Sequence, residues 1–84
     1  MSNKLGELIK SRRKAMQLTL EDMSDTCDLS KSYLNEIENG RKSNISITTI
    51  FKISLVLDVK PSEILSAAIL TVFEDKATAE VPDV

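Results

Sequence analysis

Residues 19–41, "TLEDMSDTCDLSKSYLNEIENGR", decide how the chain folds. In the first half of this stretch, Leu20, Met23 and Cys27 recur at i, i+3 and i+7, which places them on one face of a helix. Thr19 is a favourable N-cap, so the pattern predicts a helix over about 20–27. The chain must turn after it, and Asp28 tolerates the left-handed backbone that such a turn requires.

The second half of the stretch predicts another short helix over about 31–38. Ser30 is suited to its N-cap, Leu34 and Ile37 mark its buried face, and Gly40 stands at its C-terminal cap. Two short helices joined by a turn of about four residues are typical of a helix-turn-helix. The spacing alone leaves open a helical hairpin that binds no DNA.

The flanking sequence predicts three more helices in an all-α chain. Apolar spacing and capping residues indicate helices over about 4–16 and 47–57, and Pro61 opens a fifth helix with apolar residues through Phe73. No helical period continues from Lys76, so residues 76–84 are expected to form an acidic flexible or extended tail. The chain has 84 residues, and we expect one domain over residues 1–75.

The net charge is −2, but the charges are unevenly distributed. Residues 1–52 carry nine Lys or Arg against seven Asp or Glu, a balance of +2, whereas residues 53–84 carry two against six, a balance of −4. Because local charge governs the attraction to phosphates, the overall acidity does not exclude a nucleic-acid partner.

The residue inventory argues against catalysis and metal binding. The chain has no histidine, a single cysteine and no glycine-rich phosphate loop, so it lacks the commonest general base and the usual zinc ligand. No apolar run reaches the roughly 18 residues of a membrane span, and the N-terminus lacks the order of a signal peptide. We therefore expect a cytoplasmic protein that is not an enzyme, with no cofactor, no metal and no membrane association.

Two longer stretches, "LTLEDMSDTCDLSKSYLNEIENGR" and "SITTIFKISLVLDVKPSEIL", together resemble the lambda-repressor-like, or Cro/XRE-type, helix-turn-helix family. The second stretch matches the Leu-Lys-Ile-Ala…Leu…Val…Leu frame that is usual in that family, at Ile50, Lys52, Ile53, Leu57, Val59 and Leu65. The resemblance covers residues 5 to about 66. It implies a compact five-helix bundle whose third helix enters the major groove of double-stranded DNA.

The resemblance assigns base contacts to the N-terminal part of the third helix. The candidate base-contacting residues are Lys31, Ser32, Tyr33, Asn35 and Glu36. Lys31 can donate to guanine, Asn35 can pair with adenine, and the glutamate can accept from cytosine. Four of these residues lie opposite the apolar face of the helix, whereas Tyr33 is equally consistent with a partly buried aromatic at the helix edge.

Phosphate contacts are expected from the start of the second helix and from the loop that follows the third helix. The candidates are Thr19, Asn39, Arg41, Lys42, Ser43 and Asn44. Backbone amides near Thr19 and Leu20 are expected to be free to face a phosphate. The family often has glutamine where Leu20 stands, so Leu20 is left out of the site. A solvated loop without DNA contact is the alternative interpretation of "RKSN".

The resemblance also implies a partly buried structural ion pair between Arg13 and Glu38, with neither residue reading bases. The fifth helix, in turn, carries apolar residues beyond the part that resembles the family: Ile69, Leu70, Val72 and Phe73. They could pack on their own bundle. We expect them instead to form a two-fold contact between two copies of the chain.

These expectations combine into a sequence-specific DNA-binding transcriptional regulator that binds a palindromic operator as a homodimer. A phage repressor, a restriction–modification controller and an antitoxin all remain open, as does activation versus repression. RNA polymerase or a cognate partner protein is left open as a further partner. The competing class is an acidic helical module that binds a partner protein and no DNA.

Overall fold

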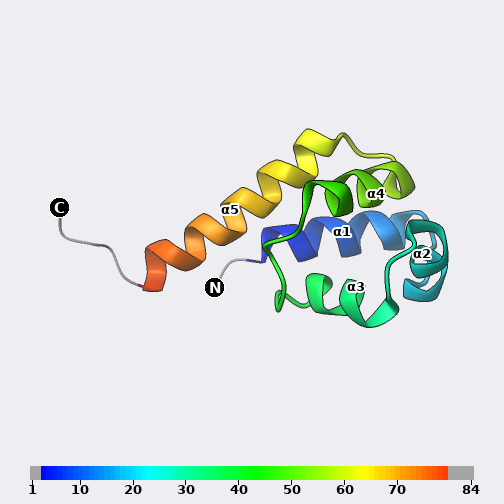
Figure 1. Ribbon diagram of the computed structural model, residues 1–84, viewed down its shortest axis with the longest axis horizontal. Helices are drawn as coiled ribbons and strands as arrows, with labels where there is room; N and C mark the ends of the chain where they lie inside the picture. The colour runs from blue at the N-terminus through cyan, green and yellow to red at the C-terminus, as the bar shows by residue number, and fades with distance from the viewer. Residues whose placement is uncertain (1–2, 80–84) are drawn as a thin grey trace.

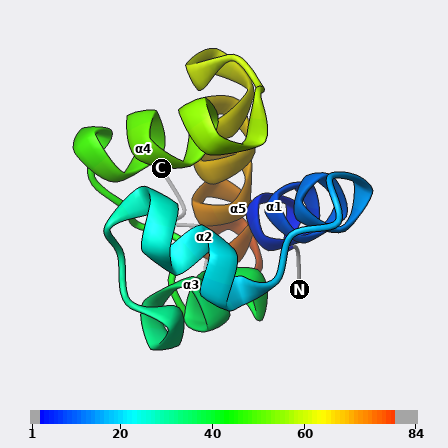
Figure 2. The ribbon, with the colours of Figure 1, turned by 90° about the vertical axis from the view of Figure 1, so that its right-hand side faces the viewer.

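The computed structural model describes residues 3–79, with side chains through residue 73, and within that range it contains five α-helices and no strand (Figure 1). The helices are α1 (Lys4–Ala15), α2 (Leu20–Cys27), α3 (Lys31–Glu38), α4 (Ile47–Leu57) and α5 (Pro61–Ala79). The prediction of an all-α, five-helix bundle is therefore confirmed. Figure 2 shows α2 and α3 next to each other on one side of the bundle.

Local side-chain chemistry sets where the helices begin and end. The hydroxyl of Ser30 accepts from the Tyr33 amide and begins α3, and Ser46 begins α4 in the same way. Asp28 ends α2 in the left-handed conformation, with φ of 58°, as its position in the sequence predicts. Gly40 follows α3 with φ of 78°, a backbone angle that glycine adopts without steric cost.

The core lies where α1 meets the other helices. The helix α1 packs against α3, α4 and α5, while α2 packs against α3 and α4. The largest apolar side chains that are fully buried come from all five helices: Leu5, Ile9, Met23, Leu34, Ile37, Ile53, Leu57 and Ile64. Because this core holds both α2 and α3, it fixes the angle between the two helices of the helix-turn-helix.

The first turn of α1 is bonded to two other helices. The amide of Leu5 donates to Oγ1 of Thr71 on α5 at 3.0 Å, and Nδ2 of Asn3 donates to the carbonyl of Glu38 on α3 at 3.0 Å. Gly6 allows this close approach, since a Cβ there would lie 2.5 Å from the carbonyl oxygen of Glu38. The start of α1 is thus a junction between α3 and α5.

The helix α5 is longer than the sequence pattern predicts. It continues to Ala79, so residues 76–79 are helical and the tail predicted from Lys76 is wrong for these residues. Residues 74–79, "EDKATA", contain no glycine or proline and include alanines, so the backbone can remain helical without an apolar period. The rest of the predicted tail, residues 80–84, lies outside the described residues. Among residues 3–79, no helix combines the length and the hydropathy needed to cross a lipid bilayer.

Candidate nucleic-acid interface

The two faces of α3 have opposite environments. Leu34 and Ile37 are fully buried, whereas Lys31, Ser32 and Asn35 are exposed. This separation follows from the helical period, because positions i, i+1 and i+4 share one side of a short helix. The structure therefore brings three of the predicted base-contacting residues onto one outward surface.

The remaining two candidates on α3 are less exposed. Tyr33 is half-buried and packs against the hydrophobic core, on the same side of the helix as Ile37. Part of the Tyr33 side chain therefore packs in the core, and it is less accessible than Lys31, Ser32 and Asn35. Glu36 is also half-buried, and its carbonyl accepts from the amides of Arg41 and Lys42 at 2.8 and 3.3 Å.

Asn39 bonds back onto α3. Its Nδ2 donates to the carbonyl of Asn35 at 2.8 Å and to Oδ1 of Asn35 at 2.9 Å. The sequence predicts a phosphate contact for Asn39, but the Nδ2 group that would donate to a phosphate already donates to Asn35 at the end of the helix. The contact holds the Asn35 amide group in one orientation, with its Nδ2 hydrogens directed away from Asn39.

The predicted partners Arg13 and Glu38 meet in a two-point contact. Nε and Nη2 of Arg13 donate to the two carboxylate oxygens of Glu38 at 2.7 and 3.0 Å, and Nη1 donates to the carbonyl of Leu18 at 2.8 Å. The side chains are 12% and 4% exposed, respectively. The hydrogen bond to Glu38 raises the pKa of Arg13, while burial acts in the opposite direction. This contact attaches the last turn of α3 to α1.

The start of α2 differs from the sequence expectation. Oγ1 of Thr19 accepts from the Asp22 amide at 3.0 Å, and the Thr19 amide donates to the Asp22 carboxylate at 2.9 Å. This reciprocal pair is a capping box. Hydrogen bonds to the Asp22 carboxylate, first from the Thr19 amide and second from the Thr19 side chain, lower the pKa of Asp22. The Thr19 amide is therefore not free for a phosphate. The amides of Leu20 and Glu21 have no protein acceptor among the described residues.

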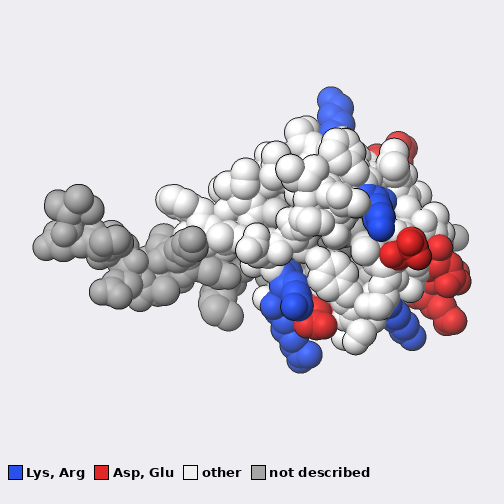
Figure 3. Space-filling view, in the orientation of Figure 1, with Lys and Arg blue, Asp and Glu red and all other residues white. Residues whose placement is uncertain are grey.

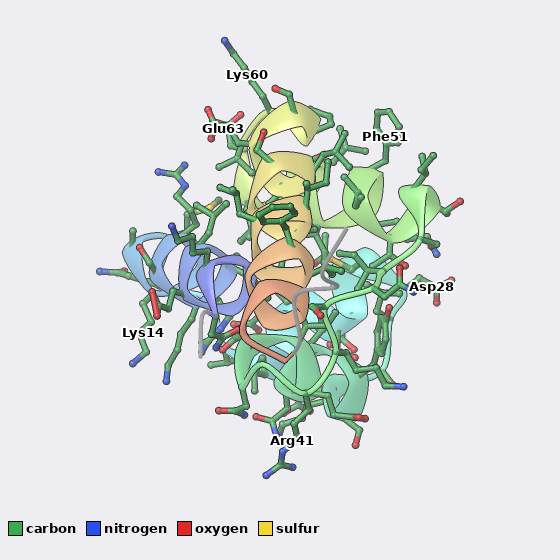
Figure 4. The ribbon with its side chains drawn as sticks, turned by 90° about the vertical axis from the view of Figure 1, so that its left-hand side faces the viewer. Lys14, Asp28, Arg41, Phe51, Lys60 and Glu63 are labelled. Atoms are coloured by element: carbon green, nitrogen blue, oxygen red, sulfur yellow. The ribbon has the colours of Figure 1, made fainter. Side chains whose placement is uncertain are left out.

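The loop after α3 divides into two parts. Arg41 and Lys42 are exposed, and Figure 4 shows Arg41 projecting into solvent beside α3, on the opposite side of the molecule from Phe51 and Lys60. Ser43 and Asn44 instead line a groove against α5. The structure thus keeps the basic pair near α3 and brings the two polar residues to the predicted dimer surface.

The acidic side chains are concentrated over α2. Figure 3 shows a group of acidic side chains there, whereas basic side chains, with acidic atoms beside them, lie along the edge formed by α3 and its following loop. The acids of α2 and its C-cap that have exposed side chains are Glu21, Asp22, Asp25 and Asp28. A polyanion would be attracted to the α3 edge and repelled from the outer side of α2.

An apolar groove lies between α5, α4 and the loop before α4. Ile69, Val72 and Phe73 line it, together with Ile50 and Leu65. Ile69 is 56% exposed and Phe73 67% exposed. Leu70, the fourth residue predicted for a dimer contact, is exposed but does not line this groove.

A second exposed apolar stripe was missed by the sequence reading. Ile47, Phe51 and Leu55 recur every four residues along α4 and are 71%, 51% and 80% exposed. The sequence signal was present, because α4 has apolar residues on more than the one face that its own core can bury.

Comparisons with known proteins agree with this geometry. The sequence model of the helix-turn-helix family matches residues 9–64. The chain is 32% identical over 76 residues to the HTH-type transcriptional regulator SinR of Bacillus subtilis (strain 168), covering 90% of this chain and 68% of SinR. It is 33% identical over 70 residues to the control protein C.BamHI of Bacillus amyloliquefaciens, covering 77% of this chain and 85% of that protein.

A solved structure extends the similarity to three dimensions. The crystal structure of SinR, the master regulator for biofilm formation, in complex with DNA superposes with a TM-score of 0.69 and 36% identity, covering 73% of this chain and 97% of that chain. The sequence match, the shared fold and the exposed face of α3 all indicate a helix-turn-helix protein. The chain belongs to the Cro/C1-type helix-turn-helix family.

Proposed function

We propose that the chain is a sequence-specific DNA-binding transcriptional regulator that binds a palindromic operator as a homodimer. The observation that carries this proposal is the outward surface of α3, where Lys31, Ser32 and Asn35 are exposed while Leu34 and Ile37 are held in the core. An α-helix fits the major groove of B-DNA, and these side chains have the donors that base edges there accept. The family membership of the chain supports the same function.

Phosphate contacts would flank α3 on two sides. Arg41 and Lys42 would contact the backbone at one end, because both are exposed cations directly after the helix. At the other end, the backbone amides of Leu20 and Glu21 remain able to donate to a phosphate oxygen. Asn39 would act by orienting Asn35 rather than by contacting phosphate.

A second copy would cover the groove on α5. Exposed Ile69 and Phe73 together with half-buried Val72 give an apolar surface that water solvates poorly. A single module buries roughly 600–1,000 Å² on DNA, so two modules on half-sites about 34–36 Å apart would supply the affinity of a specific site. Ser43 and Asn44 line the same groove, so they would then lie at the contact between the two copies.

A mobility-shift experiment over a series of salt concentrations tests the proposal. The probe is the DNA immediately upstream of the gene, and a scrambled duplex of equal length measures nonspecific binding. Lys31→Ala should reduce the preference for the specific duplex, whereas Lys42→Ala should weaken both duplexes and lower the salt slope by about one. Lys60→Ala is the matched control, because Lys60 projects from the opposite side of the molecule (Figure 4) and should leave binding unchanged.

Two outcomes would contradict the proposal. Equal effects of Lys31→Ala and Lys42→Ala on both duplexes would show that α3 does not read bases. No binding to any duplex at low salt would support the competing function, an acidic helical module that binds a partner protein.

Within the same class, a restriction–modification control protein is a second candidate. The match to C.BamHI covers 85% of that protein, whereas the match to SinR covers 68%. Neighbouring genes for a restriction endonuclease and a methyltransferase would support this assignment. A toxin gene next to the chain's own gene would favour an antitoxin instead.

A further inference from the structure

The outward surface of α3 continues onto the first residue of α2. Leu20, Lys31, Ser32 and Asn35 together line one open groove between the two helices. Leu20 is half-buried, with part of its side chain packed against the hydrophobic core. The groove therefore has an apolar side formed by Leu20 and a polar side formed by exposed residues of α3.

This combination of groups is suited to a thymine. In the major groove, thymine presents a C5-methyl group next to its O4 acceptor, and the other three bases present no methyl group. The side chain of Leu20 offers neither a hydrogen-bond donor nor an acceptor, so it can contact a methyl group without leaving a base polar atom unpaired. Lys31 and Asn35 line the same groove. Their ammonium and amide groups can donate to acceptors on that base or on its neighbour.

We propose that Leu20 forms, with Lys31, Ser32 and Asn35, a subsite for the 5-methyl group of one thymine in each operator half-site. This inference rests on the proposed DNA binding through α3 and makes Leu20 a specificity-determining residue. The positive charge of Lys31 favours DNA over an apolar peptide in this groove. None of the four groove-lining side chains is acidic, so none would repel a phosphate next to the bound base.

The test uses deoxyuridine, which differs from thymidine only by the methyl group. An operator is first selected from random duplexes with the wild-type protein, and each thymine is then replaced singly by deoxyuridine. Burial of one methyl-sized group is worth about 0.8 kcal/mol, so a replacement in one half-site should raise Kd about fourfold. The same replacement in both half-sites should raise Kd about 15-fold. Replacements at other thymines should change Kd by less than about twofold.

Two variants separate the role of Leu20 from general effects. Leu20→Gln replaces the two methyl groups of leucine with a longer side chain that ends in a polar amide, so the variant should bind the thymine and deoxyuridine duplexes about equally. Leu8→Gln is the matched control, since Leu8 is also a half-buried leucine packed against the core but lies on α1, away from this groove. It should retain the full preference for thymine. Circular dichroism checks folding, and Leu20→Ala serves where Leu20→Gln does not fold.

Each outcome decides the inference. A selected operator with no deoxyuridine-sensitive thymine would overturn it, as would a sensitivity that persists unchanged in folded Leu20→Gln or Leu20→Ala. In both of these cases the wild-type protein still binds DNA, so the proposed function stands. No selection of any duplex would overturn the proposed function and the subsite with it.

Discussion

Replacing Arg13 with alanine tests how the last turn of α3 is held. The substitution leaves the Glu38 carboxylate, whose side chain is 4% exposed, without the two hydrogen bonds that it accepts from Arg13. Removing one partner of a buried ion pair costs about 3–5 kcal/mol, because a charge is left in the interior without compensation. At about 0.05–0.15 kcal/mol per residue, the whole chain has a free energy of unfolding of about 4–13 kcal/mol. Arg13→Ala should therefore remove a large part of the stability of the fold.

Urea unfolding followed by circular dichroism measures this loss. Arg41→Ala is the matched control, because Arg41 is exposed and its loss should change the free energy of unfolding by no more than about 0.5 kcal/mol. Replacing both partners, as Arg13→Met with Glu38→Leu, removes the charges together and should be less destabilising than Arg13→Ala. A cost below about 1 kcal/mol for Arg13→Ala would refute the reasoning, since solvent-exposed pairs have that value. A double replacement as costly as Arg13→Ala would show that lost packing, not unpaired charge, explains the effect.

Three further predictions address other parts of the molecule. Phe73→Glu should shift a sizing profile from dimer to monomer and weaken operator binding more than nonspecific binding, whereas Met16→Glu, at an exposed apolar residue outside the groove, should leave the profile unchanged. Gly6→Ala should lower the free energy of unfolding by about 1–3 kcal/mol, because its Cβ would lie 2.5 Å from the Glu38 carbonyl oxygen. Urea unfolding measures this loss as a lower midpoint, and a raised midpoint would contradict the prediction. Cys27 is buried, and burial raises the pKa of its thiol. At pH 8, iodoacetamide should therefore modify Cys27 only as fast as the chain unfolds. Rapid modification of the folded protein would contradict the buried state of this thiol.

Most of the fold could be predicted because its signals are local. The periodic apolar residues and the serine and aspartate caps lie within a few residues of the helix ends that they determine. The two faces of α3 follow from the same period. The contact between Arg13 and Glu38 joins residues 25 positions apart, and only the family resemblance indicated it.

Two differences between the sequence expectation and the structure have physical causes. At Thr19 and Asn39, nearby side chains compete for groups that were expected to face phosphate: the Asp22 carboxylate takes the Thr19 amide, and Asn35 accepts from the Asn39 amide. The spacing of Thr19 and Asp22 is that of a capping box, so this signal was available. The exposed stripe of α4 has a different cause. A helix with apolar residues on several sides does not indicate which side faces the core until its neighbours are known.

The first turn of α1 joins the two surfaces on which the proposed function depends. Asn3 bonds the end of α3, and two residues later Leu5 bonds Thr71 in the part of α5 that borders the groove. In a two-fold dimer formed through α5, the distance between the two copies of α3 depends on how firmly each α3 is fixed to its own α5. Half-sites one helical turn apart tolerate little variation in that distance. Because a rigid junction loses less conformational freedom on binding than a mobile one, the buried bonds of α1 would contribute to DNA affinity although α1 itself presents none of the proposed contacts.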